Sequence, residues 1–226
     1  TNAPTATPTP QPTATPTLIP SPLPSATVTP SITPTPTSTP QPLACAGTPP
    51  VLTDVFSPAN WGTTPFTTFS LTSNPARKAD VYFTHDAGYF YVAVVIADDT
   101  VTANDSLALY FDTDNNRGDP SAPDRFFQFT RQPAGAIGRG IGTNSDADFW
   151  ESGYTSNEWE YQYELNPTNW IIKMRINTDT EMAALGGMFN MMAKVVFAGE
   201  DIASWPQTAN SGDLSTWQGV INVTCP

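Results

Sequence analysis

The first 43 residues restrict the possible folds of this chain more than any other feature. They include 13 prolines and 13 threonines but no charged or aromatic residue. A segment of this composition buries too little apolar surface to offset its loss of entropy on folding, so it forms no core of its own. Its Thr-Pro steps favour an extended polyproline II conformation, and hydroxyls beside prolines are typical of an O-glycosylated stalk. We therefore predict a tail or linker over residues 1–43 and one globular domain over residues 44–226.

The net charge of −12 excludes some classes of partner. Only nine lysines and arginines stand against 21 acids, whereas nucleic acid and anionic lipid both demand a basic surface. No apolar stretch approaches the roughly 18 residues of a membrane-spanning helix. The chain begins at Thr1 without a basic or apolar leader, so we expect either a mature exported chain or a fragment boundary.

Two cysteines, Cys45 and Cys225, bracket the globular part of the chain. Two such distant cysteines do not form a zinc motif, and no haem attachment motif is present. The spacing predicts a disulfide that joins the first strand to the last. Because disulfides persist in oxidising compartments, the expected location is extracellular or at the cell surface.

The region after Cys45 is rich in short alternating or apolar runs separated by turn residues. Expected strands cover 79–84, 89–97, 106–111, 126–130, 160–165, 170–176, 188–197 and 217–223. A glycine-rich run over 135–142 indicates a flexible strand or a loop, and only 180–185, before Gly186-Gly187, indicates a short helix. Many short strands with regular turn signals predict an all-β fold, an antiparallel sandwich of the jelly-roll or immunoglobulin-like kind.

One loop has the composition of a cation site. Asp112, Asp114 and Asn116 alternate along it, and Asp119 and Asp124 follow. Calcium takes six to eight oxygen ligands, and alternating oxygens in a tight loop supply them. We predict a structural calcium ion here. The alternative is a solvated turn, since Asp and Asn also favour turns through bonds to their own backbone.

Several runs together resemble the family 9 carbohydrate-binding modules and the related DOMON-like sandwiches. They are Val81–Asp86, Tyr89–Val94, Asp98-Asp99, Asn104–Leu107 and Tyr110–Asp114. The resemblance extends over residues 50–176 and weakens toward the C-terminus. It implies a β-sandwich, structural calcium near the Asp112 loop and, in the members that bind sugar, two tryptophans that clamp a sugar ring.

Five tryptophans lie in or next to expected loops and are candidates for stacking on sugar: Trp61, Trp150, Trp159, Trp205 and Trp217. No pair among them can be matched to the clamp from the sequence. The alternative for each is a place in the core or between the sheets.

The sequence contains no clear catalytic motif. His85 is the only histidine, and no phosphate-binding loop is present. Acids abound, but no pair stands out as the two carboxylates of a glycoside hydrolase. We predict a non-enzymatic protein.

The tail departs from an inert linker between residues 18 and 32. Its large apolar residues before Leu43 are Leu18, Ile19, Leu23, Val28 and Ile32. From Ala26 to Ile32 apolar residues alternate with hydroxyls, which is the pattern of a half-buried strand without a partner in its own segment. Two functions follow. One is a structural subunit of a cell-surface fibre whose tail docks on copies of itself, and the alternative is a carbohydrate-binding module, with a polysaccharide partner, on a glycosylated stalk. The sequence favours the fibre.

Overall fold

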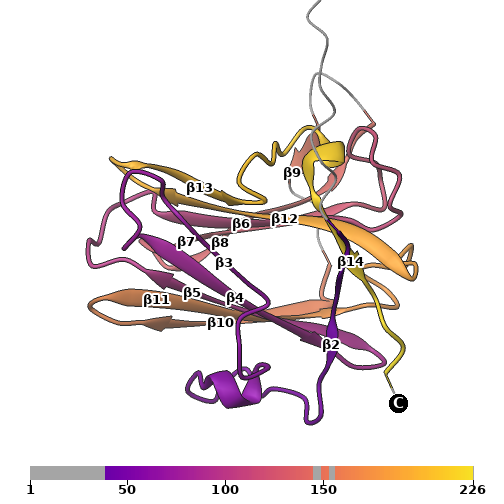
Figure 1. The fold of residues 1–226 in the computed structure, drawn as a ribbon, viewed down its shortest axis with the longest axis horizontal. Helices are drawn as coiled ribbons and strands as arrows, with labels where there is room; N and C mark the ends of the chain where they lie inside the picture. Colours follow the sequence, from indigo (N-terminus) through magenta and orange to yellow (C-terminus); the bar gives the residue numbers. More distant parts are fainter. Residues whose placement is uncertain (1–38, 145–148, 153–155, 226) are drawn as a thin grey trace, which may run out of the picture. The chain divides into compact units, whose positions relative to one another are not determined.

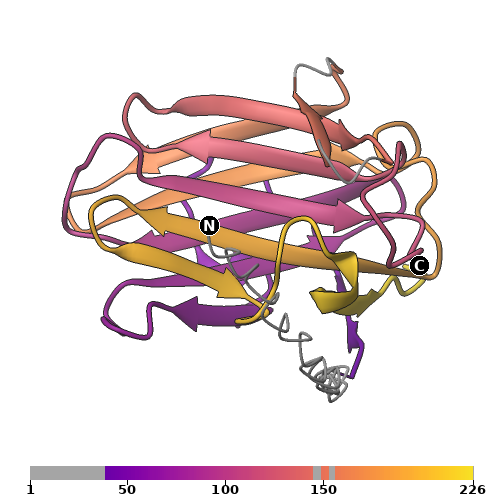
Figure 2. The same cartoon turned by 90° about the horizontal axis from the view of Figure 1, so that it is seen from above.

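Two β-sheets pack face to face in the part of the chain that the computed structural model describes, residues 39–144, 149–152 and 156–225 (Figure 1). The first sheet has eight strands in the order β1-β14-β12-β6-β7-β8-β9, and β13 also pairs with β12. The second has six strands in the order β10-β11-β5-β4-β2, and β3 also pairs with β4. Figure 2 shows the strands of the first sheet lying across those of the second.

The strands of the first sheet are β1 (Gln41–Pro42), β6 (Ser106–Asp112), β7 (Arg125–Thr130), β8 (Gly135–Gly142), β9 (Trp150–Ser152), β12 (Met188–Phe197), β13 (Asp201–Trp205) and β14 (Gln218–Ile221). Those of the second are β2 (Ala44–Cys45), β3 (Thr67–Ser70), β4 (Lys78–His85), β5 (Tyr89–Ala97), β10 (Trp159–Leu165) and β11 (Asn169–Asn177). Two 3-10 helices, η1 (Pro58–Asn60) and η2 (Leu214–Thr216), lie in the connections.

The predicted all-β sandwich is confirmed, with two differences in detail. The sheets are mixed, because β1 runs parallel to β14 and β2 runs parallel to β4. The prediction of a helix over 180–185 is wrong, since residues 178–184 form turns. There the side chain of Asn177 accepts the N–H groups of Asp179 and Thr180, and such local bonds compete with helix formation.

The chain switches sheets where the Thr/Pro-rich segment ends. Gln41 and Pro42 pair with β14 in the first sheet, and two residues later Ala44 and Cys45 pair with β4 in the second. Leu43 lies between them and is 1% exposed. Residues 39–43, which composition assigns to the tail, therefore belong structurally to the sandwich.

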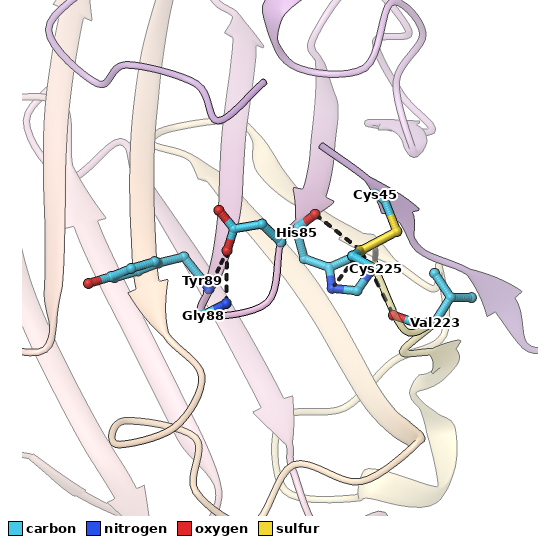
Figure 3. The surroundings of a disulfide bond; sticks show 7 residues. Cys45, His85, Gly88, Tyr89, Val223 and Cys225 are labelled. Carbon is cyan, nitrogen blue, oxygen red and sulfur yellow. Dashed lines mark hydrogen bonds between the residues drawn. A yellow bond between two sulfur atoms is a disulfide. The ribbon is translucent and has the colours of Figure 1, made fainter. Parts of the chain in front are cut away.

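The disulfide between Cys45 and Cys225 is present, with Cα atoms 5.6 Å apart, as predicted. It ties β2 to the segment after β14, and His85, at the end of β4, lies against it (Figure 3). The first strand of the second sheet and the end of the chain are thereby joined.

β5 shows why a central strand is apolar on both faces. Phe90, Val92 and Val94 point into the core between the sheets. Tyr91 and Ala93 point outward, but residues of the 46–66 connection cover them and form a second apolar cluster. Both sets of side chains are consequently buried.

The residues predicted to dock on other subunits lie outside the described part of the chain: Leu18, Ile19, Leu23, Val28 and Ile32. Within the described ranges, no helix has the length and apolar character needed to span a membrane.

Candidate functional site

Three of the tryptophans nominated for sugar stacking are held in packing contacts. Trp61 belongs to the 46–66 connection and is 2% exposed in the apolar cluster on the outer face of the second sheet. Trp150 and Trp217 stack on each other, with ring centroids 6.2 Å apart and planes 6° apart. Their indole N–H groups donate to the carbonyl groups of Ser211 and Asn210. This pair therefore anchors the connection that contains η2 to the outer face of the first sheet.

Trp205 and Trp159 are both half-buried but differ in their neighbours. Trp205 packs edge-on against Phe66. Trp159 begins β10 and lines a shallow cleft at one end of the second sheet. The other cleft residues are Tyr89, Asn157, Glu158, Glu160 and Arg175.

Register positions the polar groups of this cleft. Glu160 on β10 lies opposite Arg175 on β11, and Arg175 lies opposite Tyr91 on β5. Nη2 of Arg175 lies 2.7 Å from Oε1 of Glu160, and its guanidinium carbon lies 5.2 Å from the ring centroid of Tyr89. The hydrogen bond from Arg175 to Glu160 raises the pKa of the arginine, so the cleft carries a permanent cation.

The chemistry of the cleft suits a small polar ring. Its two half-buried aromatic rings lie on opposite faces of the second sheet, since Trp159 packs against Phe127 and Tyr89 borders the outer apolar cluster. Arg139 lies over the Trp159 ring at 5.3 Å, as Arg175 does over Tyr89, and an amide, two carboxylates and the Arg175 guanidinium supply hydrogen bonds. The cleft holds only about 40 Å³, so a ligand would lie over it rather than inside it. Side chains of Arg175 and Glu160 remain 39% and 57% exposed, which leaves both within reach of a ligand.

Trp159 also begins a row of aromatic residues along β10. Trp159, Tyr161 and Tyr163 share one side of the strand and contact Phe127 and Phe129 of the opposite sheet. Across the gap, the hydroxyl of Tyr163 donates to the carbonyl of Gly135 at 2.8 Å. The row lies at the open side of the sandwich and is only half-buried.

The predicted cation site is brought together in part. Carboxylate oxygens of Asp112, Asp114 and Asp124 lie within 4.8 Å of one another. The amide oxygen of Asn116 instead accepts the N–H of Gly118. Asp119 is exposed and lies outside this group of three.

Electrostatics in this cluster favour a bound cation. Burial raises the pKa of Asp124 to about 6, and the charges of Asp112 and Asp114 add to the rise. Burial also raises the pKa of Asp112. Because the folded pKa of Asp124 exceeds its unfolded value, the metal-free domain loses stability as the pH rises from about 4 to about 6. A cation would relieve this repulsion, so the residues fit calcium.

His85 is buried against the disulfide. It is 3% exposed, burial lowers its pKa, and its Nε2 lies 3.3 Å from Sγ of Cys225 (Figure 3). It has no serine or acid arranged for nucleophilic catalysis among the contacts of the described residues.

Sequence reasoning missed Tyr89, Glu160 and Arg175 as members of the cleft. Arg175 and Lys173 were visible as outward residues of an alternating strand, and Glu160 has the same alternation on the strand before it. Pairing those two strands as a hairpin through the 166–169 turn would have placed Glu160 opposite Arg175. Tyr89 comes from a third strand, and its position depends on the sheet order.

The comparisons with known proteins concern the fold. No protein-family model matches the sequence, and no curated protein does. Among solved structures, the chain is similar to a family 9 carbohydrate-binding module from Caldicellulosiruptor kristjanssonii, in complex with cellotriose in one structure and with glucose in another. Both have a TM-score of 0.59 and 12% identity, and the match covers 82% of this chain and 95% or 97% of theirs. The domain therefore has the fold of the family 9 carbohydrate-binding modules, as the resemblance implied.

Proposed function

We propose that this protein is a non-catalytic carbohydrate-binding module that acts outside the cytosol and binds sugar at the Trp159 cleft. The observation that carries the proposal is the combination of two aromatic rings with Glu160 and Arg175 at one end of the second sheet. Sugar rings bind through stacking on aromatic faces and through planar polar groups that accept and donate hydrogen bonds. The solved structures of the same fold contain cellotriose and glucose. The disulfide supports the location outside the cytosol.

Calorimetric titration with cellotriose and glucose tests this function. Trp159→Ala should weaken binding at least about 30-fold, because a stacking ring contributes on the order of 2 kcal/mol. Arg175→Gln should weaken it roughly tenfold through loss of one charged hydrogen bond. Trp205→Ala is the matched control, since it removes an equally half-buried indole at a different place. Equal losses in the two tryptophan variants, or no binding by the wild type at millimolar sugar, would contradict the proposal.

We also propose that the carboxylate cluster holds calcium as a structural ion. Asp112, Asp114 and Asp124 would supply ligands from the loop between β6 and β7. The ion would neutralise charges that otherwise repel one another in a largely buried place. Its role is to stabilise the loop.

Thermal unfolding in calcium and in a chelator tests the ion. At a hundredfold excess over its dissociation constant, calcium should stabilise the domain by about 2.7 kcal/mol. Asp114→Asn should remove most of this calcium-dependent gain, whereas Asp119→Asn, a change of another exposed acid in the same loop, should retain it. Identical melting temperatures with calcium and with chelator would show that the loop is only a turn.

Assembly into a cell-surface fibre is a second candidate function, and it stays a prediction. The structural comparisons favour the carbohydrate-binding module. One feature of the domain nevertheless suits assembly, namely the edge strand β10, which in the described part of the chain pairs only with β11.

A further inference from the structure

The edge strand β10 has seven residues, Trp159–Leu165, and in the described part of the chain it pairs only with β11. The N–H and C=O groups on its other side are available to an added strand. Edges of this length are usually shortened, bulged or covered in natural proteins, because they accept strands from other chains. The regular β10–β11 register shows no bulge that would turn this edge away.

An incompletely buried apolar surface accompanies that edge. Trp159, Tyr161 and Tyr163 are half-buried on the side facing the opposite sheet. At the end of the strand, Leu165 is 55% exposed and nearby Val101 is 60% exposed. Both line a hollow of about 490 Å³ that also includes Ala134 and Pro167. A strand placed beside β10 would cover this surface with its own apolar side chains.

The tail contains one segment with the matching length and pattern. Residues 26–32 are seven in number, uncharged, and alternate Ala26, Val28, Pro30 and Ile32 with two threonines and a serine. In a strand, alternate residues direct their N–H and C=O groups to opposite edges. If the residues with hydroxyl side chains pair with β10, the missing N–H of Pro30 points away from the new ladder and removes no bond from it.

Chain length indicates that the donor comes from another molecule. Seven residue steps separate Ile32 from Thr39, which limits their separation to about 25 Å. Thr39 precedes β1, whereas β10 faces β7, four strand positions along the first sheet from β1. Those positions span about 19 Å, the sheets lie about 10 Å apart, and the chain must pass round the outside of a sheet. The path from Thr39 to the edge of β10 is therefore longer than the residues between Ile32 and Thr39 can span.

We propose that the free edge of β10 accepts residues 26–32 of a second copy of this chain as an added strand that runs parallel to β10. Glu158 and Asn166 bond to the β11 side, so Trp159, Tyr161, Tyr163 and Leu165 direct their backbone groups to the free edge. In a parallel pair the hydroxyl residues that bond to them carry side chains on the other face, which leaves the apolar side of the added strand over the Trp159–Leu165 row. Each copy then carries one donor and one acceptor at different places. Such head-to-tail contacts produce open chains of subunits when the rotation between copies does not close a ring. This inference does not depend on sugar binding.

Analytical ultracentrifugation of the full chain tests the proposal. The wild type should self-associate in a concentration-dependent manner. Val28→Asp with Ile32→Asp removes the donor, and Leu165→Asp removes the acceptor at an exposed residue; each should weaken association more than about 100-fold, because an unpaired charge would be buried. An equimolar mixture of the two variants should form dimers only, since one intact donor and one intact acceptor remain between them.

Matched controls separate this contact from general effects of charge. Thr5→Asp with Thr9→Asp adds the same charge elsewhere in the tail, and Ile202→Asp adds it at the exposed isoleucine of β13; both should associate like the wild type. A wild type that stays monomeric at high concentration, a donor variant that associates normally, or a mixture that stays monomeric would each overturn the proposal. The added strand would cover Trp159, so cellotriose titration is done at protein concentrations where the wild type and the variants are all monomeric; there it should be unchanged, so failure of assembly and failure of sugar binding are distinguishable.

Discussion

Replacing both Cys45 and Cys225 with serine is expected to lower the free energy of unfolding by about 5 kcal/mol. The bridge closes a loop with a sequence separation of 180, so its loss frees a large part of the unfolded chain. It also releases β2, only two residues long, and the last residues of the chain, which otherwise hold each other. A loss of this size is a large fraction of the stability of a typical domain.

Urea unfolding of the double variant measures this effect. The slope of unfolding free energy against urea should increase, because an unfolded chain without the crosslink exposes more surface. Wild-type protein with its disulfide reduced is the control for the new hydroxyl groups, and it should show a similar loss. A change below about 1 kcal/mol would mean that the segments around the bridge hold the ends of the sandwich without it.

Asp98→Ala should cost about 3–5 kcal/mol, the second large effect, because it leaves the buried Arg131 without a carboxylate and removes the one buried carboxylate of Arg77, which keeps Asp99 and Glu200. Asp98 follows β5, is 2% exposed, and lies 2.5 Å from Nη1 of Arg77 and 2.8 Å from Nη1 of Arg131. Arg77 precedes β4 in the second sheet, and Arg131 follows β7 in the first. The carboxylate thus joins the two sheets at one end of the sandwich.

The adjacent residue provides the control for that prediction. Asp99 also pairs with Arg77, at 2.7 Å, but its side chain is 73% exposed. Asp99→Ala should therefore cost less than about 1 kcal/mol, since water screens exposed ion pairs. Chemical unfolding of the two variants under identical conditions makes the comparison. Similar losses for both would show that the buried pair does not carry the connection between the sheets.

Alternation and turn chemistry in the sequence predict most of the long strands, and the structure shows why. Strands such as Met188–Phe197 are apolar over most of their length, because residues 189–193 are all buried, and such a run is recognisable in the sequence. The short strands Thr67–Ser70 and Asp201–Trp205 lack such a pattern, because each has only four or five residues and a single buried one. The parallel pairing of β1 with β14 and of β2 with β4 depends on how the chain enters the sandwich, and no local sequence pattern predicts it.

The candidate site was less accessible from the sequence than the fold. Alternating oxygens mark the Asp112 loop in the sequence, and the carboxylates of Asp112, Asp114 and Asp124 converge. Asn116 instead donates its amide N–H to Asp114, and Asp119 lies outside the group of three. Among the tryptophans, a position next to a loop does not distinguish Trp61, which is buried in the outer apolar cluster, from Trp159, which lines a cleft. The partners of Trp159 come from three strands, so their proximity is a property of strand order and register.

A crystal structure of the protein with cellotriose tests the central claim most directly. A glucosyl ring should lie in van der Waals contact with Trp159 or Tyr89, with its hydroxyl groups hydrogen-bonded to Arg175 or Glu160. Sugar bound at another place on the domain, or an empty Trp159 cleft in crystals saturated with cellotriose, would contradict it.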